Sequence, residues 1–451
     1  MAIKVGFVSL GCPKNQLDTE VMLHEILQAG YEITPEDIDA DVIIVNTCAF
    51  IESAKKEAID NILDVAWLKK NRHLKAIIVT GCLAERYGEE IFRELPEVDA
   101  VLGVGSIHNI VEAIEAVTVK KKKGSQQKYF SHEDKDTVRL GGERVITTPE
   151  YTAYIKIAEG CDNRCAYCAI PSIRGKFRSR PMEELVAEAK QLQALGVREL
   201  VVVAQDITRY GLDLYGKYAL AELLHRITEE TDIPWIRLLY CYPDKITDEL
   251  ITEMRDNPRI LKYIDLPLQH ISDRMLHAMN RHGDGKMIRG VLEKLKQEIP
   301  EIVIRTTFIV GFPGENEADF EELCEFVKEQ RFDHAGVFTY SREEDTPAYD
   351  LPDQIDEQIK QDRMDVLMRM QMEINEELNR EKVGKVIDVI CEDYDPVAEV
   401  HFGRSAADAP EIDGKVYFRS EARIAPGSFV KVKVRKVVDY DLYGNIVTVK
   451  K

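Results

Sequence analysis

Three cysteines lie within eight residues of one another in the segment EGCDNRCAYCAIPSIRG. Cys161, Cys165 and Cys168 form a C-x3-C-x2-C pattern that follows the apolar run TAYIKIA. Thiolates this close together can bind one metal cluster without help from distant parts of the chain, and cubane iron–sulfur clusters commonly take four cysteine ligands. Because this segment offers only three, the pattern predicts a cluster with one iron open to a further ligand.

Two other interpretations of these three thiols stay open, a structural zinc site and unrelated surface cysteines. Structural zinc usually takes four ligands, with cysteines in paired C-x2–4-C spacing. A second such pair does not follow nearby in the sequence. The sequence therefore favours the iron–sulfur cluster. Its place after a strand also fits a ligand site, because active sites of parallel barrels lie at the carboxyl ends of the strands.

Three further cysteines, Cys12, Cys48 and Cys82, each follow a short apolar run: FVSLGC, IVNTC and IVTGC. Their spacings of 36 and 34 residues are close to one strand–helix–strand unit each. Successive parallel strands point the same way, so the thiols should emerge at one carboxyl edge, where open α/β folds bind ligands. Nearby helix amino termini favour thiolates. The pattern predicts a second three-thiolate cluster, and the alternative is three buried small side chains at strand ends.

The other three cysteines, Cys241, Cys324 and Cys391, share no such pattern, and we expect them to be packing residues. The amino terminus lacks the basic and apolar segments of a secretory signal. No apolar run is long and uncharged enough to predict a transmembrane helix. We therefore expect a cytoplasmic protein without a membrane partner, in which disulfides are disfavoured.

The elements that must position these cysteines indicate a multidomain α/β chain. Residues 1–117 alternate strand patterns such as DVIIVN and KAIIVT with helical patterns, which predicts a parallel α/β sheet with crossover helices. Residues 118–150 are polar and charged, and we interpret them as a linker that includes an extended hairpin.

The second alternating block, residues 151–382, predicts a partial TIM-like (β/α) barrel with about six units, followed by a long connecting helix. The methionines of that amphipathic helix are expected to pack against the barrel. Residues 383–451 predict a small antiparallel β-barrel. Alternation in VKVKVRKVV places Lys431, Lys433 and Arg435 on one strand face, and YDLYGNIVTV predicts a turn at Gly444 and Asn445.

The charge balance limits the class of partner. The 451 residues include 60 Lys and Arg against 80 Asp and Glu, a net charge of -20. Phosphate binding needs positive surface, so a chain this acidic is a poor general nucleic-acid binder. An acidic surface instead suits a basic protein partner.

The C-x3-C-x-aromatic-C pattern after a first barrel strand resembles the radical S-adenosylmethionine superfamily. The resemblance implies a 4Fe-4S cluster whose open iron binds the amine and carboxylate of S-adenosylmethionine, and whose electron cleaves that cofactor to a 5′-deoxyadenosyl radical. It also implies that Tyr167 lies near the adenine; ordinary loop packing is the alternative. The glycine-rich turn FIVGFPGE, with Gly311, Pro313 and Gly314, is a candidate cofactor contact because glycine permits close backbone approach, and a plain turn is the alternative.

With both cysteine groups in place, the whole chain resembles the methylthiotransferase family, in which a three-cysteine domain, a radical barrel and a TRAM domain follow in this order. The resemblance implies domains at residues 1–117, 151–382 and 383–451. It implies two 4Fe-4S clusters and S-adenosylmethionine used twice, as methyl donor to sulfur and as radical source. A second cluster that presents sulfur on its free iron suits insertion of sulfur into an unactivated C–H bond.

One branch of this family modifies adenosine in transfer RNA, and another modifies the β-carbon of an aspartate in small-subunit ribosomal protein twelve. The segments SLGCPKNQLDTE and GRSAADAPEIDG resemble the second branch. Charge supports the same choice, since residues 1–117 hold 10 Lys and Arg against 20 Asp and Glu. Segment 388–413 adds eight acidic residues: Asp388, Glu392, Asp393, Asp395, Glu399, Asp408, Glu411 and Asp413. A basic ribosomal protein fits such a surface better than RNA does, although the basic strand face could touch RNA.

The remaining alternative is a non-catalytic iron–sulfur carrier, which would not cleave S-adenosylmethionine. We expect an electron donor such as a small flavoprotein. Beyond the six cysteines, the sequence identifies no catalytic residue.

Overall fold

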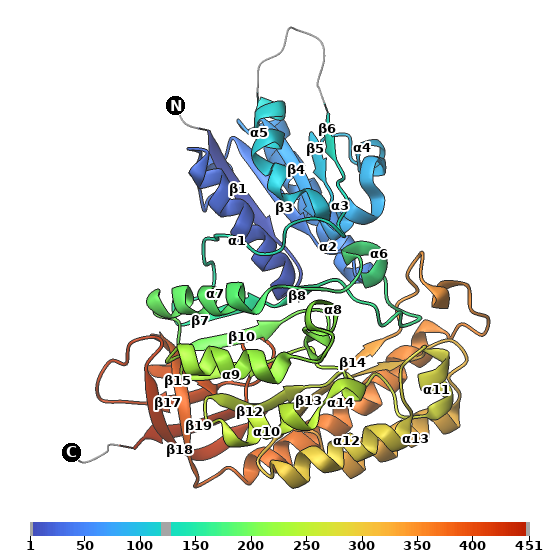
Figure 1. Ribbon diagram of the computed structural model, residues 1–451, viewed down its shortest axis with the longest axis vertical. Helices are drawn as coiled ribbons and strands as arrows, with labels where there is room; N and C mark the ends of the chain where they lie inside the picture. Colours follow the sequence, from blue (N-terminus) through green and yellow to red (C-terminus); the bar gives the residue numbers. More distant parts are fainter. Residues whose placement is uncertain (1–2, 119–127, 448–451) are drawn as a thin grey trace. The chain divides into compact units, whose positions relative to one another are not determined.

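Six parallel strands form the sheet of the amino-terminal part of the chain, in a computed structural model that describes residues 3–118 and 128–447 (Figure 1). Their order is β2-β1-β3-β4-β5-β6, and every neighbouring pair is parallel. The strands are β1 (Lys4–Ser9), β2 (Glu32–Ile33), β3 (Val42–Thr47), β4 (Ala76–Gly81), β5 (Ala100–Leu102) and β6 (Tyr129–Ser131).

Helices cover both faces of this sheet. Side chains of α1 (Pro13–Gln28) and α5 (Ile110–Thr118) share one hydrophobic core with the strands. Side chains of α2 (Glu52–Asn71), α3 (Cys82–Tyr87) and α4 (Ile91–Glu94) share the core on the other face. All residues of β3 and β4 are buried, as expected for apolar strands of a parallel sheet covered on both sides.

The segment between the first two predicted domains is partly built into this sheet. The hairpin was predicted within the linker 118–150, of which residues 119–127 lie outside the described residues. Strand β6 follows directly and pairs with β5 at the sheet edge. Farther on, Arg144 forms a buried ion pair with Glu20 of α1. Strand β6 was not predicted, because three residues are too few to show an alternating pattern.

The second parallel sheet also has six strands, in the order β14-β13-β12-β11-β10-β7. They are β7 (Thr152–Lys156), β10 (Glu199–Val203), β11 (Trp235–Leu238), β12 (Ile260–Asp265), β13 (Val303–Val310) and β14 (His334–Thr339). The main intervening helices are α7 (Met182–Ala194), α9 (Leu220–Glu230), α10 (Asp248–Asp256), α12 (Gly285–Glu298) and α13 (Glu317–Gln330), with the short α8 (Leu212–Tyr215) and α11 (Asp273–Ala278). The predicted partial barrel of six strand–helix units is confirmed.

The loop that carries Cys161, Cys165 and Cys168 follows β7 and is bounded by short elements. Strand β8 (Ala158–Glu159) pairs antiparallel with β9 (Arg178–Ser179), and α6 (Ile170–Arg174) lies between the loop and β9.

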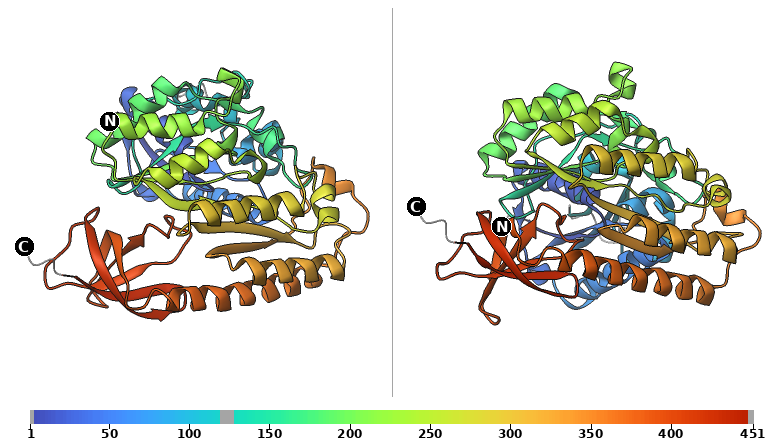
Figure 2. Two further views of the ribbon diagram at one scale, coloured as in Figure 1. Left: turned by 60° about the horizontal axis from the view of Figure 1, so that its bottom comes forward. Right: turned by 90° about the horizontal axis from the view of Figure 1, so that it is seen from below.

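The connecting helix is α14 (Glu357–Arg380), which Figure 2 shows running alongside the sheet to the carboxyl-terminal barrel. The expectation that its methionines pack inward is wrong for Met372, which is 47% exposed. Its buried face is largely polar instead. Gln371 and Asn375 donate side-chain hydrogen bonds of 2.8 and 2.9 Å to the carbonyls of Phe332 and Asp333. The helix thus satisfies backbone groups at the start of β14, which hydrophobic periodicity cannot reveal.

The carboxyl-terminal strands close into a five-stranded barrel in the order β15-β16-β17-β19-β18. They are β15 (Val386–Asp395), β16 (Val400–Ser405), β17 (Val416–Arg419), β18 (Phe429–Val438) and β19 (Asp441–Ile446). Four of the five pairings are antiparallel as predicted, but β17 and β19 pair in parallel. In the barrel, β19 therefore lies between β17 and β18.

The predicted turn at Gly444 and Asn445 is wrong, because both residues lie inside β19. The chain reverses before them, at Asp439, whose φ of 52° is left-handed. Gly444 is required for another reason. A Cβ atom there would lie 2.4 Å from the carbonyl oxygen of Lys433 on β18, so the glycine allows the two strands to approach closely.

The described chain divides into two units, each compact by itself. One comprises residues 1–147, 156–180 and 341–350. The other comprises residues 148–155, 181–340 and 351–451. Both groups of three cysteines therefore belong to the first unit, together with the segment that follows β14. None of the helices in the described residues is both long and apolar enough to span a membrane.

Inside the second unit, a buried ion pair network joins the sheet to the five-stranded barrel. The carboxylate of Glu199 on β10 accepts hydrogen bonds from Arg237 Nε at 2.8 Å and Arg404 Nη1 at 3.2 Å. The side chains of Glu199 and Arg237 are fully buried, and that of Arg404 is nearly so. Burial raises the pKa of Glu199, but the two arginines outweigh it and hold that pKa below its ordinary value.

Replacing Glu199 with Gln should therefore destabilise the second unit strongly. Two buried guanidinium groups would lose the carboxylate between them, and breaking a buried pair in this way typically costs about 3–5 kcal/mol. The lowered pKa means that this stability is present above the ordinary pKa of 4.5 and is lost as the pH falls through the folded value. Urea unfolding at pH 7 and at acid pH measures both effects. The exposed pair of Asp388 and Lys431 supplies the control, since Asp388→Asn should cost less than about 1 kcal/mol; equal losses would contradict the prediction.

Candidate metal centres

Cys12, Cys48 and Cys82 lie at the carboxyl ends of three neighbouring strands, β1, β3 and β4. The last register pair of β3 and β4 is Thr47 with Gly81, and Cys48 and Cys82 are the next residues of the two strands. Cys12 follows β1 and is the N-cap residue of α1, while Cys82 begins α3. The predicted gathering of the three thiols at one sheet edge is thus confirmed, whereas their role as metal ligands stays a prediction.

The pKa values of these thiols show that they are electrostatic neighbours. Burial and the charges of Cys82 and Cys12 raise the pKa of Cys48 to about 12. Burial also raises the pKa of Cys82, against the lowering influence of Arg174. Burial acts in the same direction on Cys12, but the charges of Lys14 and Arg174 outweigh it, so the pKa of Cys12 is lowered. Of the three thiols, Cys12 is thus shifted toward the thiolate, while Cys48 and Cys82 are shifted toward the neutral thiol, so the expectation that this edge favours thiolates is wrong for those two.

Asn15 ties the loop after β1 to the end of β3. Its Nδ2 donates to the carbonyl of Thr47 at 2.8 Å and to that of Leu10 at 3.2 Å. In return, Asn46 Nδ2 donates to the Asn15 carbonyl at 2.8 Å. Asn15 Oδ1 also lies 3.6 Å from the sulfur of Cys82. One amide side chain thus fixes the segments that carry all three cysteines.

Thiolates are the ligands of iron–sulfur clusters, so the donor set of this edge fits the predicted cluster. In residues 3–118 and 128–447, no three His, Cys, Asp or Glu side chains converge as ligands of one metal ion. Ligands of a single ion all lie about 2–2.3 Å from one atom. A cubane cluster instead spreads its thiolates over separate irons. Three thiols on three strand ends, with buried cations beside them, suit the second arrangement.

The second group of cysteines lies in one loop, closed at its base by the β8–β9 pair. The Cys161 amide donates to the carbonyl of Gly175 at 3.1 Å, and the Cys168 amide donates to the carbonyl of Cys165 at 3.0 Å. Arg164 adopts a left-handed φ of 48°, which turns the chain between the cysteines. These contacts fix the backbone on both sides of the three thiols, so the loop fits the predicted cluster. The nine cysteines of the chain form no disulfide.

The predicted cofactor contacts divide between the two units. Tyr167 is half-buried in the cysteine loop. Gly311, Pro313 and Gly314 belong to the second unit, in the turn after β13. The Gly314 amide donates to the carbonyl of Asp353 at 2.9 Å. Both glycines have left-handed φ values, 72° and 78°.

Contacts inside the second unit already account for part of this turn. The Gly311 amide donates to the buried carboxylate of Glu315, and a Cβ atom on Gly311 would lie 2.2 Å from the Lys360 side chain. Glu315 in turn accepts a 2.9 Å hydrogen bond from Arg363. A contact between the turn and a cofactor therefore stays a prediction.

A buried ionic network missed by the sequence lies beside Cys82. Arg174 of α6 donates to Asp18 Oδ2 at 2.6 Å and to Cys82 Sγ at 3.7 Å. Lys156 donates to Asp18 and to Glu159 at 2.6 Å each. All four charged side chains are at least nine-tenths buried. The available signal was the position of Arg174 and Glu159 on either side of the cysteine loop, but sequence alone could not pair them with Asp18.

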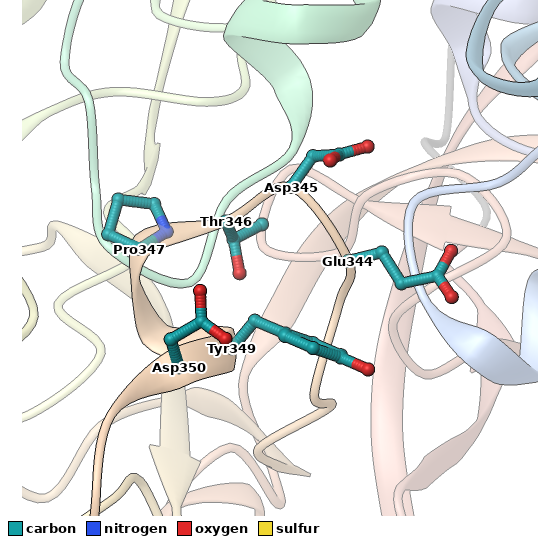
Figure 3. A pocket seen from close by; sticks show the side chains of 6 residues that line it. All are labelled: Glu344, Asp345, Thr346, Pro347, Tyr349 and Asp350. Carbon is teal, nitrogen blue, oxygen red and sulfur yellow. The ribbon is translucent and has the colours of Figure 1, made fainter.

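Segment 341–350 is also placed in the first unit. Buried Glu343 pairs with Arg86 of α3 at 3.0 Å and with Lys55 of α2 at 3.3 Å. The Ala348 amide donates to the carbonyl of Ala166, inside the cysteine loop, at 2.9 Å. Figure 3 shows a pocket formed by this segment, lined by Glu344, Asp345, Thr346, Pro347, Tyr349 and Asp350. The segment therefore braces the cysteine loop and presents carboxylates beside it.

The cysteines outside the two groups differ in burial. Cys241 and Cys391 are buried, at 3% and 0% exposure, and Cys324 is half-buried on α13. Burial raises the pKa of all three thiols, to about 11 in the case of Cys391. These positions agree with the packing role expected for them.

Substituting Gly81, which precedes Cys82, should displace the end of β4. Its φ is 89°, and an added Cβ would lie 2.3 Å from Asn46 Oδ1 and 2.5 Å from the Thr47 carbonyl oxygen. Gly81→Ala should therefore combine backbone strain with overpacking, at a cost of about 2–5 kcal/mol. Gly30→Ala is the matched control, because Gly30 has a φ of 84° but open space around it. Thermal unfolding measures the loss of stability in both variants. An equal loss in Gly81→Ala and Gly30→Ala would contradict the prediction, because the clash at Gly81 would then add nothing to the backbone strain.

Family comparisons agree with this architecture. The Uncharacterized protein family UPF0004 matches residues 4–103, the Radical SAM superfamily matches residues 155–327, and the TRAM domain matches residues 383–447. Among solved structures, the chain is similar to the radical S-adenosylmethionine methyltransferase TsrM from Kitasatospora setae, with a TM-score of 0.56 and 13% identity over 85% of this chain and 79% of that one. That likeness shows the fold alone.

Curated relatives match nearly the whole chain. The protein named ribosomal protein uS12 methylthiotransferase RimO of Desulforamulus reducens is 51% identical, over 98% of this chain and 99% of its own length. The protein of the same name from Acetivibrio thermocellus is 48% identical, over 99% of both chains. The architecture, the two groups of three cysteines and these full-length matches agree, and the chain belongs to the RimO family of methylthiotransferases, which are radical S-adenosylmethionine enzymes.

Proposed function

We propose that the chain attaches a methylthio group to the β-carbon of an aspartate in ribosomal protein uS12, in the cytoplasm. The relatives that are about half identical over their full length carry that substrate in their names. The observation that carries the proposal is the presence, in one compact unit, of two separate groups of three thiols. Each group leaves one corner of a cubane cluster without a cysteine ligand.

In this proposal Cys161, Cys165 and Cys168 hold the cluster that binds S-adenosylmethionine. When bound, this cluster and S-adenosylmethionine supply the radical chemistry needed to attack an unactivated C–H bond. The chain contributes the rigid loop between β8 and β9 and the braced segment at Ala348. Tyr167, in the same loop, is the proposed contact for the cofactor. A small flavoprotein is the proposed electron donor.

Cys12, Cys48 and Cys82 hold the second 4Fe-4S cluster and the sulfur that is transferred. The carboxyl edge of the first sheet suits this role, because Cys82 is buried, Cys12 and Cys48 are half-buried, and the buried guanidinium of Arg174 lies beside them. Asn15 keeps the three strand ends in place through its hydrogen bonds to Leu10 and Thr47.

Charge supports a basic protein substrate, but with fewer acidic groups than the sequence alone suggests. Asp408 and Asp413 are not surface residues, because their side chains are 9% and 2% exposed and face His334. Glu392 pairs with Arg404. The exposed members of the set are Asp388, Asp393, Glu399 and Glu411. These side chains and the acidic amino-terminal domain are the parts able to attract a basic ribosomal protein.

The two cysteine groups should be separable by mutation. In reconstituted enzyme, Cys165→Ala should abolish the production of 5′-deoxyadenosine and keep about four irons, while Cys48→Ala should keep cofactor cleavage but lose methylthiolation. Cys324→Ala is the control and should retain about eight irons. Iron and sulfide analysis, with mass spectrometry of uS12 and of transfer RNA, reads out all three variants. Loss of the same cluster in both variants would contradict two separate sites, and a mass gain on transfer RNA would identify the other substrate.

Neutralising exposed acidic residues of the barrel should weaken binding of uS12. The variant with Asp393→Asn, Glu399→Gln and Glu411→Gln should lose about 1 kcal/mol, roughly fivefold in affinity, at low salt and much less at high salt. The control combines Asp388→Asn with Lys431→Gln, which removes an exposed ion pair without changing net charge. Equal affinities for variant and control at low salt would reject the charge argument.

A further inference from the structure

Arg174 follows Cys168 by six residues, yet its side chain belongs to the other cysteine group. Its guanidinium is 2% exposed. Nη2 donates to Cys82 Sγ at 3.7 Å and to Asn15 Oδ1. Nη1 donates to Asp18 Oδ2 at 2.6 Å. One nitrogen of the fork therefore faces a sulfur, and the other is held by a carboxylate.

The charges around Arg174 balance before any thiolate is counted. Arg174 and Lys156 are the cations of the network, and Asp18 and Glu159 are its anions. The ammonium of Lys156 donates a hydrogen bond of 2.6 Å to each of the two carboxylates. Arg174 is the member of the network that also contacts a cysteine. Neutralising the two buried carboxylates does not require this contact with Cys82.

We propose that Arg174 is a positioning residue of the cluster held by Cys12, Cys48 and Cys82: its guanidinium donates a hydrogen bond to the Cys82 sulfur and thereby favours the reduced form of that cluster. This inference rests on the proposed function, since it requires those three cysteines to be ligands. In this proposal, the segment after β7 carries Cys161, Cys165 and Cys168 and also supplies the arginine that contacts the other cysteine group.

The physical reason is electrostatic. A guanidinium stays charged at all pH values at which a protein is folded. Hydrogen bonds to ionised partners are about twice as strong as neutral ones, and burial strengthens them further. Reduction adds one electron from an external donor, such as dithionite, and no bond or proton changes place. Because hydrogen bonds to the sulfurs set the potentials of iron–sulfur clusters, a donor fixed on Cys82 stabilises the added negative charge.

A purely structural role for Arg174 predicts a different result. If the guanidinium only neutralises Asp18 and Glu159, its loss lowers stability but leaves the potential of the cluster unchanged. The midpoint potential therefore separates the two roles, and activity alone does not.

The test uses the full chain with Cys161→Ala, Cys165→Ala and Cys168→Ala, so that the remaining cluster is the one under study. After anaerobic reconstitution, the reduced fraction is followed by electron paramagnetic resonance during titration with dithionite. Adding Arg174→Gln should lower the reduced-to-oxidised ratio about tenfold at a fixed potential, a shift of about 59 mV for one electron. Iron content should stay at about four atoms per chain.

Three further variants test for misfolding, for a general charge effect and for the role of the planar guanidinium. Arg174→Gln combined with Asp18→Asn removes one charge of each sign and should show most of the same shift. Lys156→Gln removes the other buried cation and should shift the potential much less, because Lys156 contacts the carboxylates and Arg174 contacts the sulfur. Arg174→Lys keeps the charge without the planar fork and should fall between parent and Arg174→Gln.

An unchanged potential in the Arg174 variants, or an equal shift in the Lys156 variant, would overturn the inference. Either result would leave the proposed function standing, because the cluster would still be present. If the parent variant binds no iron at its remaining cysteines, the assignment of Cys12, Cys48 and Cys82 fails, and the proposed function fails with it.

Discussion

The parallel register of β1, β3 and β4 is the constraint on which the amino-terminal site depends. Strands β3 and β4 end at Thr47 and Gly81, which pair with each other and directly precede Cys48 and Cys82. Strand β1 ends at Ser9, three residues before Cys12. Cysteines separated by more than thirty residues therefore meet at one sheet edge. A shift of this register by one residue would turn a thiol to the opposite face, because side chains alternate along a strand. The hydrogen bonds of Asn15 to the carbonyls of Leu10 and Thr47 fix the ends of β1 and β3 relative to each other.

Repetition explains why the gathering of these three thiols at one sheet edge could be predicted from the sequence. Cys12, Cys48 and Cys82 recur with the period of one strand–helix unit, and period and strand pattern together fix an edge of the sheet. The loop of Cys161 was visible for a different reason, since its three cysteines are local. Both kinds of signal lie along the chain. The contact of Arg174 with Cys82 joins segments 92 residues apart and follows no period, so sequence patterns could not reveal it.

Charge was less informative than hydrophobic periodicity. Acidic letters in the segment GRSAADAPEIDG predicted a surface for a basic partner, but Asp408 and Asp413 turn inward. Asp413 accepts a 2.6 Å hydrogen bond from Tyr263 of β12. A carboxylate looks the same in the sequence whether it meets solvent or a buried cation, and only the partner distinguishes the two. The prediction for α14 failed in a similar way, because none of its buried residues is a methionine: they are Lys360, Arg363, Leu367, Gln371, Ile374, Asn375 and Asn379.

The buried network around Arg174 places charged side chains where apolar packing could give the first unit similar stability. Burying an ion pair costs desolvation, and well-packed apolar residues are often as stabilising. Charged groups add direction, however, because a guanidinium fork and a carboxylate bind at defined angles. Asp18 on α1 accepts from both Arg174 and Lys156, which lie on opposite sides of the cysteine loop. The carboxylate thereby fixes both ends of that loop against α1, whose N-cap residue is Cys12. Apolar contacts have no such directionality, so the charged groups hold the segments that carry both groups of cysteines in a defined geometry.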